Sequence, residues 1–228
     1  MTLTTYDFEQ GSDEWNAARR GMVTASVVGQ LLTSSGTVAH NETSRALTNL
    51  LVAERITGYT DPTYVSADME RGNYDEPLAR DHYSENIEPV TQVGFMVRDE
   101  FGFKLGFSPD GLVGDDGLIE IKSRRQKKHL ETILTDKVPT ENMAQIQCGL
   151  LVSRRKWCDY CSWSGGMPMW TIRVTPNRHW REAILEAVAA FEETATTMIT
   201  RYENITRGLP ETERTPDLYT EMTLDGHH

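Results

Sequence analysis

Hydrophobic residues recur at helical spacing in several stretches of the chain. The longest stripe predicts a helix over residues 177–202 that packs against the core, and it consists of Trp180, Ile184, Val188, Phe191, Ala195 and Met198. Shorter stretches of the same period predict helices over residues 13–20, from 26 onward, 44–56, 73–85 and 139–153. Ser26 is expected to cap the second of these helices, and Pro77 is expected within the first turn of the fourth.

Short runs rich in β-branched and aromatic residues indicate strands. They predict strands over residues 90–98, 104–109 and 118–122, and a hairpin that joins 156–164 to 169–174. The order of helices, strand meander, helix, hairpin and helix predicts one α/β domain with a central mixed β-sheet flanked by helices. This domain is expected to span residues 1–207. Residues 208–228 are acidic and lack an apolar stripe, so we expect a flexible C-terminal tail.

Composition narrows the class of protein. The 228 residues are 38% hydrophobic and 25% charged, which is ordinary for a globular protein with its own core. No run of apolar residues is long enough to span a bilayer, and the N-terminus lacks the basic and apolar segments of a signal peptide. We therefore expect a cytoplasmic protein without a membrane partner. The three cysteines cannot all pair, which fits a reducing compartment.

Charge is unevenly distributed along the chain. The net charge of −11 argues against diffuse, coat-like binding to nucleic acid. A local exception lies between Lys122 and Lys128, where five of seven residues are basic. This basic run is either a segment that tracks phosphates or a plain solvated loop, and its place beside the candidate site described next favours the first interpretation.

Two carboxylates and a lysine form the main candidate site. The run from Gly114 to Gly117 predicts a turn, so Asp110 and Glu120 should face each other across a hairpin. Glu120 and Lys122 stand two residues apart on the returning strand and therefore share a face. Paired carboxylates suit a hard cation such as Mg²⁺ or Mn²⁺. The backbone carbonyl of Ile121 could complete the coordination, and Lys122 could contact a bound water or a phosphate oxygen. Taken alone, a Glu-x-Lys pair is more often solvated surface charge.

These residues resemble a known nuclease signature. Pro109-Asp110, nine residues and then Glu120-Ile121-Lys122 match the PD-(D/E)xK pattern. The neighbouring blocks are similar to the YqaJ-like viral recombinase family, which is related to the phage lambda exonuclease. Four blocks match in order over about residues 8–200, and Trp15 falls where the family has a tryptophan. The blocks are residues 19–26, 71–76, 107–122 and 143–147.

The resemblance implies a fold and a set of roles. It implies a restriction-endonuclease-like fold and two Mg²⁺ ions. Glu76 would be the third acid near the metals, Asp110 would bridge both ions, and Glu120 with the Ile121 carbonyl would hold one. Lys122 would orient or deprotonate the attacking water. The residues that would grip the 5′-phosphate are Arg19, Ser26, Ser108 and Gln145. After Lys122 many relatives have Cys-Pro, whereas this chain has Ser123-Arg124-Arg125, so Arg124 and Arg125 are candidate DNA contacts with weaker family support.

The resulting hypothesis is a Mg²⁺-dependent 5′→3′ exonuclease. It would degrade one strand of linear double-stranded DNA from its end, to expose single strand for phage homologous recombination. The resemblance also implies a ring-shaped homotrimer, a phage single-strand annealing protein as partner, and a phage or prophage origin in a bacterial host. The alternatives are an endonuclease or resolvase on the same fold, and a non-catalytic DNA-end-binding protein. The presence of all four candidate catalytic residues, Glu76, Asp110, Glu120 and Lys122, argues against the last.

The remaining chemistry-bearing residues favour structural interpretations. Cys158 and Cys161 form a C-x-x-C, but an Fe–S cluster normally needs four thiolates and these two would face opposite sides of a strand. Reduced, packed thiols are the expected state. The histidines show no ligand spacing, and only His82, six residues after Glu76, could line the cleft. Three tryptophans of the hairpin are expected to pack rather than stack on bases, and they are Trp157, Trp163 and Trp170.

Overall fold

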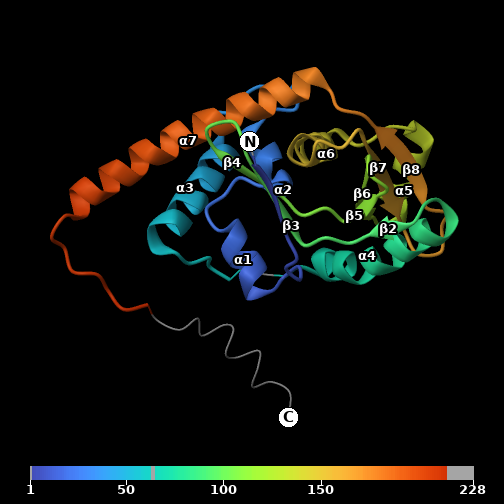
Figure 1. Ribbon diagram of the computed structural model, residues 1–228, viewed down its shortest axis with the longest axis horizontal. Helices are drawn as coiled ribbons and strands as arrows, with labels where there is room; N and C mark the ends of the chain where they lie inside the picture. The colour runs from blue at the N-terminus through green and yellow to red at the C-terminus, as the bar shows by residue number, and fades with distance from the viewer. Residues whose placement is uncertain (1, 63–64, 215–228) are drawn as a thin grey trace, which may run out of the picture.

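The computed structural model describes residues 2–62 and 65–214 (Figure 1). Its helices are α1 (Asp13–Arg19), α2 (Ala25–Val28), the short 3-10 helix η1 (Gly29–Leu31), α3 (Glu42–Thr57), α4 (Ala67–Asn86), α5 (Gln126–Thr135), α6 (Thr140–Ser153) and α7 (Arg178–Thr206). Its strands are β1 (Thr2–Tyr6), β2 (Val90–Thr91), β3 (Phe95–Asp99), β4 (Lys104–Phe107), β5 (Gly111–Val113), β6 (Gly117–Ser123), β7 (Trp157–Trp163) and β8 (Trp170–Val174).

The strands form two sheets rather than the single central sheet that the sequence predicts. A three-stranded antiparallel sheet has the order β1-β3-β4. A five-stranded mixed sheet has the order β2-β5-β6-β7-β8, in which β6 and β7 run parallel and the other neighbours are antiparallel. The expected mixed α/β fold is confirmed, and the separation into two sheets is a correction.

The division arises within the stretch 90–98, which the sequence predicts as one strand. Val90–Thr91 belongs to the five-stranded sheet and Phe95–Asp99 to the three-stranded sheet. Gly94 lies between them, where a Cβ atom would stand 2.1 Å from the backbone oxygen of Phe8. The chain can pass this point because glycine lets two backbones approach closely. This close approach depends on Phe8, 86 positions away, and cannot be predicted from the hydrophobic pattern around Gly94.

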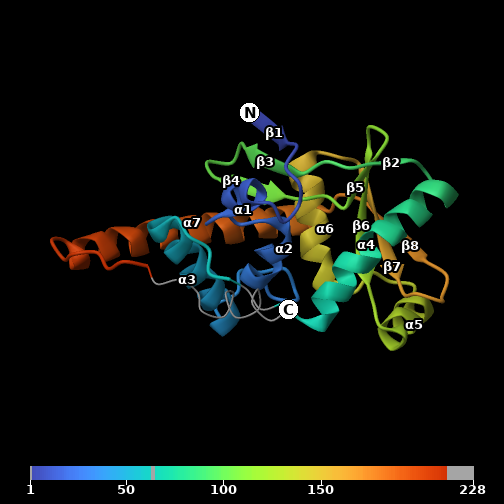
Figure 2. The same cartoon turned by 90° about the horizontal axis from the view of Figure 1, so that it is seen from below.

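Helices cover both faces of the five-stranded sheet. Ala79 and Tyr83 of α4 pack with Ile119 and Ile121 of β6 on one face, whereas Leu118 belongs to the larger core cluster that includes α6 and α7. Figure 2 shows α4 lying across the strands of this sheet and α6 beside them. Because alternate residues of a strand point to opposite sides, Glu120 and Lys122 share the face of Leu118, toward α6.

Two helix boundaries differ from the prediction. Helix α4 begins at Ala67 rather than near residue 73, with Ser66 as its N-cap, so Pro77 stands inside the helix instead of in its first turn. Proline has no N–H, and the carbonyl of Asn73 therefore lacks its helical donor. Helix α2 is a single turn capped by Thr24, so Ser26 is its second residue and not the N-cap.

Two elements were not predicted. Residues 126–128 of the basic run form the first turn of α5, so this stretch is neither a loop nor a plain extension of β6. A helix start with basic residues opposes the helix dipole and lacks the usual acidic signal. Strand β1 is a largely exposed edge strand, and its Thr-rich sequence shows little apolar alternation.

The C-terminal half of the chain follows the prediction closely. Helix α6, the β7–β8 hairpin and the long helix α7 all form, and the stripe of α7 supplies Ile184, Val188, Phe191 and Ala195 to the core. Residues 207–214 form no helix or strand. The rest of the predicted tail lies outside the described residues, so its flexibility remains a prediction. Among the described residues, no helix is both long and apolar enough to cross a membrane.

The cysteines have the predicted character. Cys158 and Cys161 are free and buried, and they belong to the core clusters on opposite faces of the five-stranded sheet. Burial raises the pKa of both thiols well above its usual range, and the nearby carboxylates add to this shift. Both thiols pack in the core, as the sequence predicts, and their raised pKa values favour the neutral form.

Candidate active site

Nine predicted site residues line one cleft of about 310 Å³. They come from α1, α2, α4, α6, strand β6 and the segment between β4 and β5, and they are Arg19, Ser26, Glu76, Ser108, Asp110, Glu120, Ile121, Lys122 and Gln145. A larger cavity of about 830 Å³ shares Trp15, Asn73, Glu76 and Asp110 with this cleft. The two cavities therefore adjoin each other at these residues.

The hairpin of β5 and β6 brings Asp110 beside Glu120. Gly111, the first residue of β5, is opposite Ile119 in the ladder, so Asp110 lies level with Glu120. The Asp110 carboxylate accepts a hydrogen bond of 2.6 Å from the Ile121 backbone N–H, and the Asp110 carbonyl accepts one of 2.6 Å from Arg80 Nε. Both ends of Asp110 are thus fixed. Asp110 lies in the segment just before β5 and not at the end of the predicted 104–109 strand, of which residues 104–107 form β4 in the other sheet.

Glu120 is the most buried acid of the site, with 1% of its side chain exposed. Lys122 Nζ lies 2.6 Å from Glu120 Oε1, and among the described residues no hydrogen-bond donor reaches Glu120 Oε2. A buried carboxylate oxygen without a donor is costly unless something positively charged occupies the space in front of it.

The acids of the site repel one another. Desolvation raises the pKa of Asp110 well above its usual range, and the charges of Glu120 and Glu76 raise it further. Burial likewise raises the pKa of Glu76, against the lowering effect of its ion pair with Arg80. The nearby positive charges do not offset the repulsion among the three carboxylates. A divalent cation bound between them would relieve this repulsion.

The side chain of Glu76 is not placed to bind a metal ion together with the other acids. Across residues 2–62 and 65–214, no three or more His, Cys, Asp and Glu side chains are arranged to hold a metal ion. Glu76 is instead paired with Arg80, one helical turn further along α4. Asp110, Glu120 and the Ile121 carbonyl fit a hard divalent cation by ligand chemistry and by the unpartnered Glu120 oxygen. Glu76 would have to leave Arg80 to join them directly.

Lys122 contacts the acids and an amide. Its Nζ lies 3.0 Å from Gln145 Oε1 of α6 as well as 2.6 Å from Glu120. Burial by itself would lower the pKa of Lys122, but the negative charges of Glu120 and Asp110 outweigh burial and raise it. The lysine is therefore protonated at neutral pH, with its ammonium group directed at the acids and Gln145.

A cluster of donors lies at the other end of the cleft. Arg19 donates hydrogen bonds of 3.2 Å to both Ser26 Oγ and Ser108 Oγ. Trp15 donates from its indole N–H to Ser108 Oγ at 2.9 Å, and its ring lies 3.9 Å from the Arg19 guanidinium carbon. Burial lowers the pKa of Arg19 to about 10, so the group still carries its charge at neutral pH. This end of the cleft suits an anion such as a phosphate.

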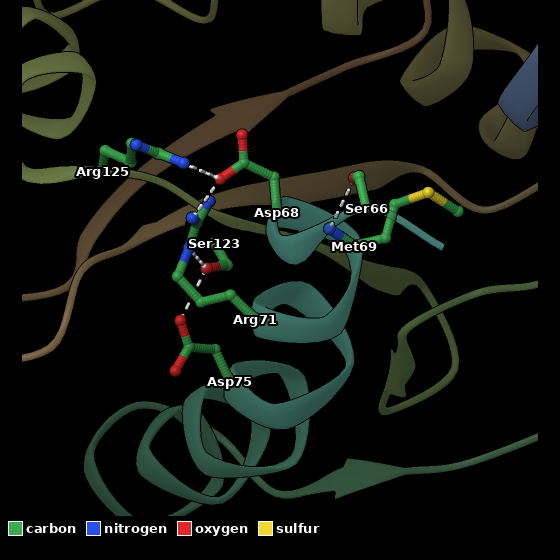
Figure 3. A network of polar contacts seen from close by, with 7 residues as sticks. All are labelled: Ser66, Asp68, Met69, Arg71, Asp75, Ser123 and Arg125. Atoms are coloured by element: carbon green, nitrogen blue, oxygen red, sulfur yellow. Dashed lines mark hydrogen bonds and ion pairs between the residues drawn. The ribbon is translucent and has the colours of Figure 1, made fainter. Parts of the chain in front are cut away.

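Two of the predicted DNA contacts lie outside this cleft. Arg125 pairs with Asp68 of α4 at 2.9 Å, and Arg124 donates to Asn142 of α6 at 2.6 Å. Figure 3 shows how α4 and the chain after β6 are joined. In that network Ser123 donates to Asp75 at 2.6 Å and accepts from Arg71 at 3.0 Å. The residues that replace the family's Cys-Pro thus attach this segment to α4 and α6.

The sequence predicts no role for Arg80, and Trp15 stands out in it only as a position where the family has a tryptophan. The spacing of Arg80, four residues after Glu76 on a helix, could have indicated the ion pair. Trp15 gives no such signal, since its partner Ser108 is 93 residues away. The suggestion that His82 lines the cleft is wrong. His82 is exposed, and its ring packs edge-on against Trp163.

Comparisons with known proteins agree on the family. The sequence model of the YqaJ-like viral recombinase domain matches residues 14–156, which include every predicted site residue. The chain is 33% identical to an alkaline exonuclease, LHK-Exo, from Laribacter hongkongensis, with a TM-score of 0.77, over 87% of this chain and 100% of that one. A structure of LHK-Exo in complex with dAMP gives 32% identity and a TM-score of 0.78 over the same shares.

A more distant structure supports the fold alone. A phage related exonuclease from Haemophilus somnus 129PT is 12% identical, with a TM-score of 0.60, over 79% of this chain and 96% of that one. A search of curated proteins found no match.

Proposed function

Because the chain belongs to the family of YqaJ-like viral recombinase domains, we propose that it is a Mg²⁺-dependent 5′→3′ exonuclease. It degrades one strand of linear duplex DNA from its end and exposes single strand for phage recombination in the bacterial cytoplasm. The observation that carries this proposal is the single cleft in which buried carboxylates and Lys122 adjoin the donor cluster of Arg19. Its similarity to an alkaline exonuclease supports the reaction class.

The acidic end of the cleft is the proposed reaction centre. Asp110, Glu120 and the Ile121 carbonyl would hold the metal, with Glu76 as a further acid. Divalent cations bound there would lower the pKa of the attacking water and neutralise charge on the phosphodiester. Lys122, protonated and held by Glu120 and Gln145, stabilises negative charge that develops on the phosphate oxygens. Mn²⁺ suits the same oxygen ligands.

The donor cluster is the proposed anchor for the DNA end. Arg19 has two N–H groups directed at Ser26 and Ser108, and a terminal 5′-phosphate can accept from the same groups. Gln145 lies beside Lys122 and lines the same cleft as the anchor. Such an anchor would hold each new 5′-phosphate after a cut and so favour repeated cleavage of one strand.

The variant Arg19→Ala is expected to slow digestion of 5′-phosphorylated duplex much more than that of 5′-hydroxyl duplex. Removing a charge-assisted hydrogen bond should lower the rate on the phosphorylated end by roughly tenfold or more. The measurement is the ratio of initial rates on the two substrates. Arg20→Ala is the matched control, because the Arg20 side chain contacts Thr60 on the surface. A wild-type protein without phosphate preference, or an Arg19→Ala variant that keeps the wild-type ratio, would contradict the assignment.

The basic run after β6 is proposed to contact the DNA backbone. Exchanging Arg124, Arg125, Lys127 and Lys128 for Gln should weaken duplex binding and flatten its salt dependence. For each phosphate that the variant no longer neutralises, the log–log slope falls by about 0.9. Fluorescence anisotropy at several salt concentrations measures the slope, with Arg201→Gln on α7 as a control for net charge. A slope equal to that of wild type would assign these residues to the contacts with α4 and α6 alone.

Assembly and partners are proposed on family membership alone. We propose a ring-shaped homotrimer and a phage single-strand annealing protein as its partner. Sedimentation of the purified protein tests the first proposal, and a monomer at micromolar concentration would contradict it.

A further inference from the structure

The turn between α1 and α2 is held by two adjacent side chains of α3. The Gly21 backbone N–H donates to Glu54 Oε2 at 2.7 Å, and the Gly21 carbonyl accepts from Arg55 Nε at 2.6 Å. Glu54 is 7% exposed, so its bond to Gly21 is shielded from water. The backbone N–H and carbonyl of Gly21 are therefore both bound by Glu54 and Arg55, which are consecutive residues of α3.

Only glycine fits at the centre of this contact. Gly21 has a φ of +66°, which L-residues rarely adopt, and a Cβ atom there would stand 2.5 Å from Arg55 Cγ and 3.3 Å from the Leu51 carbonyl. The close approach lets Glu54 and Arg55 reach the backbone of the turn directly.

Arg55 is itself fixed by α7. Its two terminal nitrogens bond to the two carboxylate oxygens of Glu192 at 2.7 and 2.8 Å, and its guanidinium lies 5.0 Å from the Phe191 ring. A bidentate pair of this kind restricts the orientation of the guanidinium plane, which in turn sets the direction of Nε. The position of Gly21 thus depends on the long helix α7 through Arg55.

The contact between Gly21 and α3 lies close in the chain to Arg19, the central residue of the donor cluster. Arg19 is the last residue of α1, and its carbonyl accepts from Met22 across the turn at 3.0 Å. Helix α1 has no buried residue, and the hydrogen bond from the Trp15 indole to Ser108 is one of the contacts that hold it. On the far side of Gly21, Val23 is attached to the Gly106 backbone at 3.1 Å. Gly21 lies two residues after Arg19, so its contact with α3 bears on the backbone from which the Arg19 side chain extends.

We propose that Glu54 and Arg55 are positioning residues for the DNA-end anchor: they hold the Gly21 peptide and so aim the Arg19 side chain at Ser26 and Ser108. Glu192 supports Arg55 in this role. The inference rests on the proposed function, in which Arg19 binds the terminal 5′-phosphate of DNA.

The test compares variants of Glu54 by their preference for a phosphorylated end. Glu54→Gln keeps an oxygen that can accept from Gly21, whereas Glu54→Ala does not. Glu54→Ala and Arg55→Ala are expected to lower the ratio of initial rates on 5′-phosphate and 5′-hydroxyl duplex by roughly tenfold, because a misplacement of about 1 Å can cost up to about 10²-fold and a smaller shift is expected here. Glu54→Gln should keep the ratio within about twofold of wild type. A general loss of folded protein lowers both rates and leaves the ratio unchanged.

Further variants keep the outcome decisive. Arg178→Ala, which breaks an exposed Arg–Glu pair on α7, should leave the ratio at its wild-type value. If both alanine variants fail to fold, Glu192→Gln decides, because it weakens the hold on Arg55 without touching the turn, and a lowered ratio is expected. Folded Glu54→Ala and Arg55→Ala proteins, or a Glu192→Gln protein, with the wild-type ratio would overturn the proposal.

A binding arm separates this inference from the proposed function. Anisotropy without divalent cation gives the affinities for 5′-phosphate and 5′-hydroxyl duplex. If the wild-type protein prefers the phosphorylated end but never digests DNA, the exonuclease assignment is contradicted. The positioning role of Glu54 and Arg55 is then still supported, provided that their variants lose this binding preference. A wild-type exonuclease whose variants keep the preference contradicts the positioning role alone.

Discussion

Exchange of Asp110 for Asn is expected to abolish DNA cleavage. The substitution keeps the shape of the side chain and an oxygen that can accept from the Ile121 N–H, but it removes the negative charge that a hard cation requires. Loss of an outer-shell partner of a metal ligand typically costs 10–100-fold, so loss of a direct ligand should cost more than ~100-fold in rate. Glu120→Gln should behave alike.

Stability distinguishes a ligand role from a folding role for Asp110. The folded protein raises the pKa of Asp110, which means that folding favours its protonated form. The folded state then binds more protons than the unfolded chain, so without metal the stability falls as pH rises through the raised pKa. Asn cannot ionise and avoids this loss. In buffer that contains a chelator at neutral pH, the thermal unfolding midpoint of Asp110→Asn should equal or exceed that of the wild-type protein.

Asp115→Asn is the matched control for Asp110→Asn. Asp115 is an exposed carboxylate in the turn of the same β5–β6 hairpin, and its exchange should have no effect on rate. Calorimetry with Mg²⁺ should show weakened binding for Asp110→Asn and unchanged binding for Asp115→Asn. Activity of Asp110→Asn within tenfold of wild type would rule out the carboxylate site.

Lys122→Ala is expected to reduce the cleavage rate by roughly 10²–10⁴-fold while the protein still binds metal. The negative charges of Glu120 and Asp110 raise the pKa of Lys122, so in the proposed mechanism Lys122 donates a hydrogen bond and stabilises negative charge. Removing a positive neighbour 2.6 Å from Glu120 should leave the affinity for a divalent cation unchanged or raise it.

The comparison for Lys122→Ala is Lys156→Ala. Lys156 pairs with Asp116 at 2.8 Å on the surface of the same sheet, and its side chain is largely exposed. Rates under single-turnover conditions and calorimetric titration with Mg²⁺ measure the two effects separately. If metal binding and activity disappear together in Lys122→Ala, Lys122 has a structural role and the proposed chemistry is wrong.

The residues of the site were accessible from sequence because their spacing is local. The Gly114–Gly117 turn sets the register that places Asp110 level with Glu120, and strand alternation directs Glu120 and Lys122 to one face. Arg19 and Gln145 came only from the family resemblance. Their meeting in one cleft depends on contacts between α1, α6 and the sheets that no local pattern encodes.

Features that depend on distant backbone contacts were not predictable. The passage of Gly94 against Phe8 divides one apparent strand between two sheets. The contact of Gly21 with Glu54 joins residues 33 positions apart, and in the sequence Glu54 is merely an acid at helical spacing. The start of α5 has basic residues where acidic ones are usual, so tertiary packing of His129 and Thr132 overrides the local signal.

Digestion of linear and covalently closed circular duplex, side by side with Mg²⁺ and with chelator, tests the central claim most directly. The linear substrate should carry a 5′-phosphate or a 5′-hydroxyl in separate reactions. We predict Mg²⁺-dependent loss of one strand from the 5′ ends of linear DNA, faster with the phosphate, and intact circular DNA. Cleavage of the circle at a comparable rate would indicate an endonuclease, and end binding without digestion would indicate a non-catalytic protein; either result would contradict the exonuclease assignment.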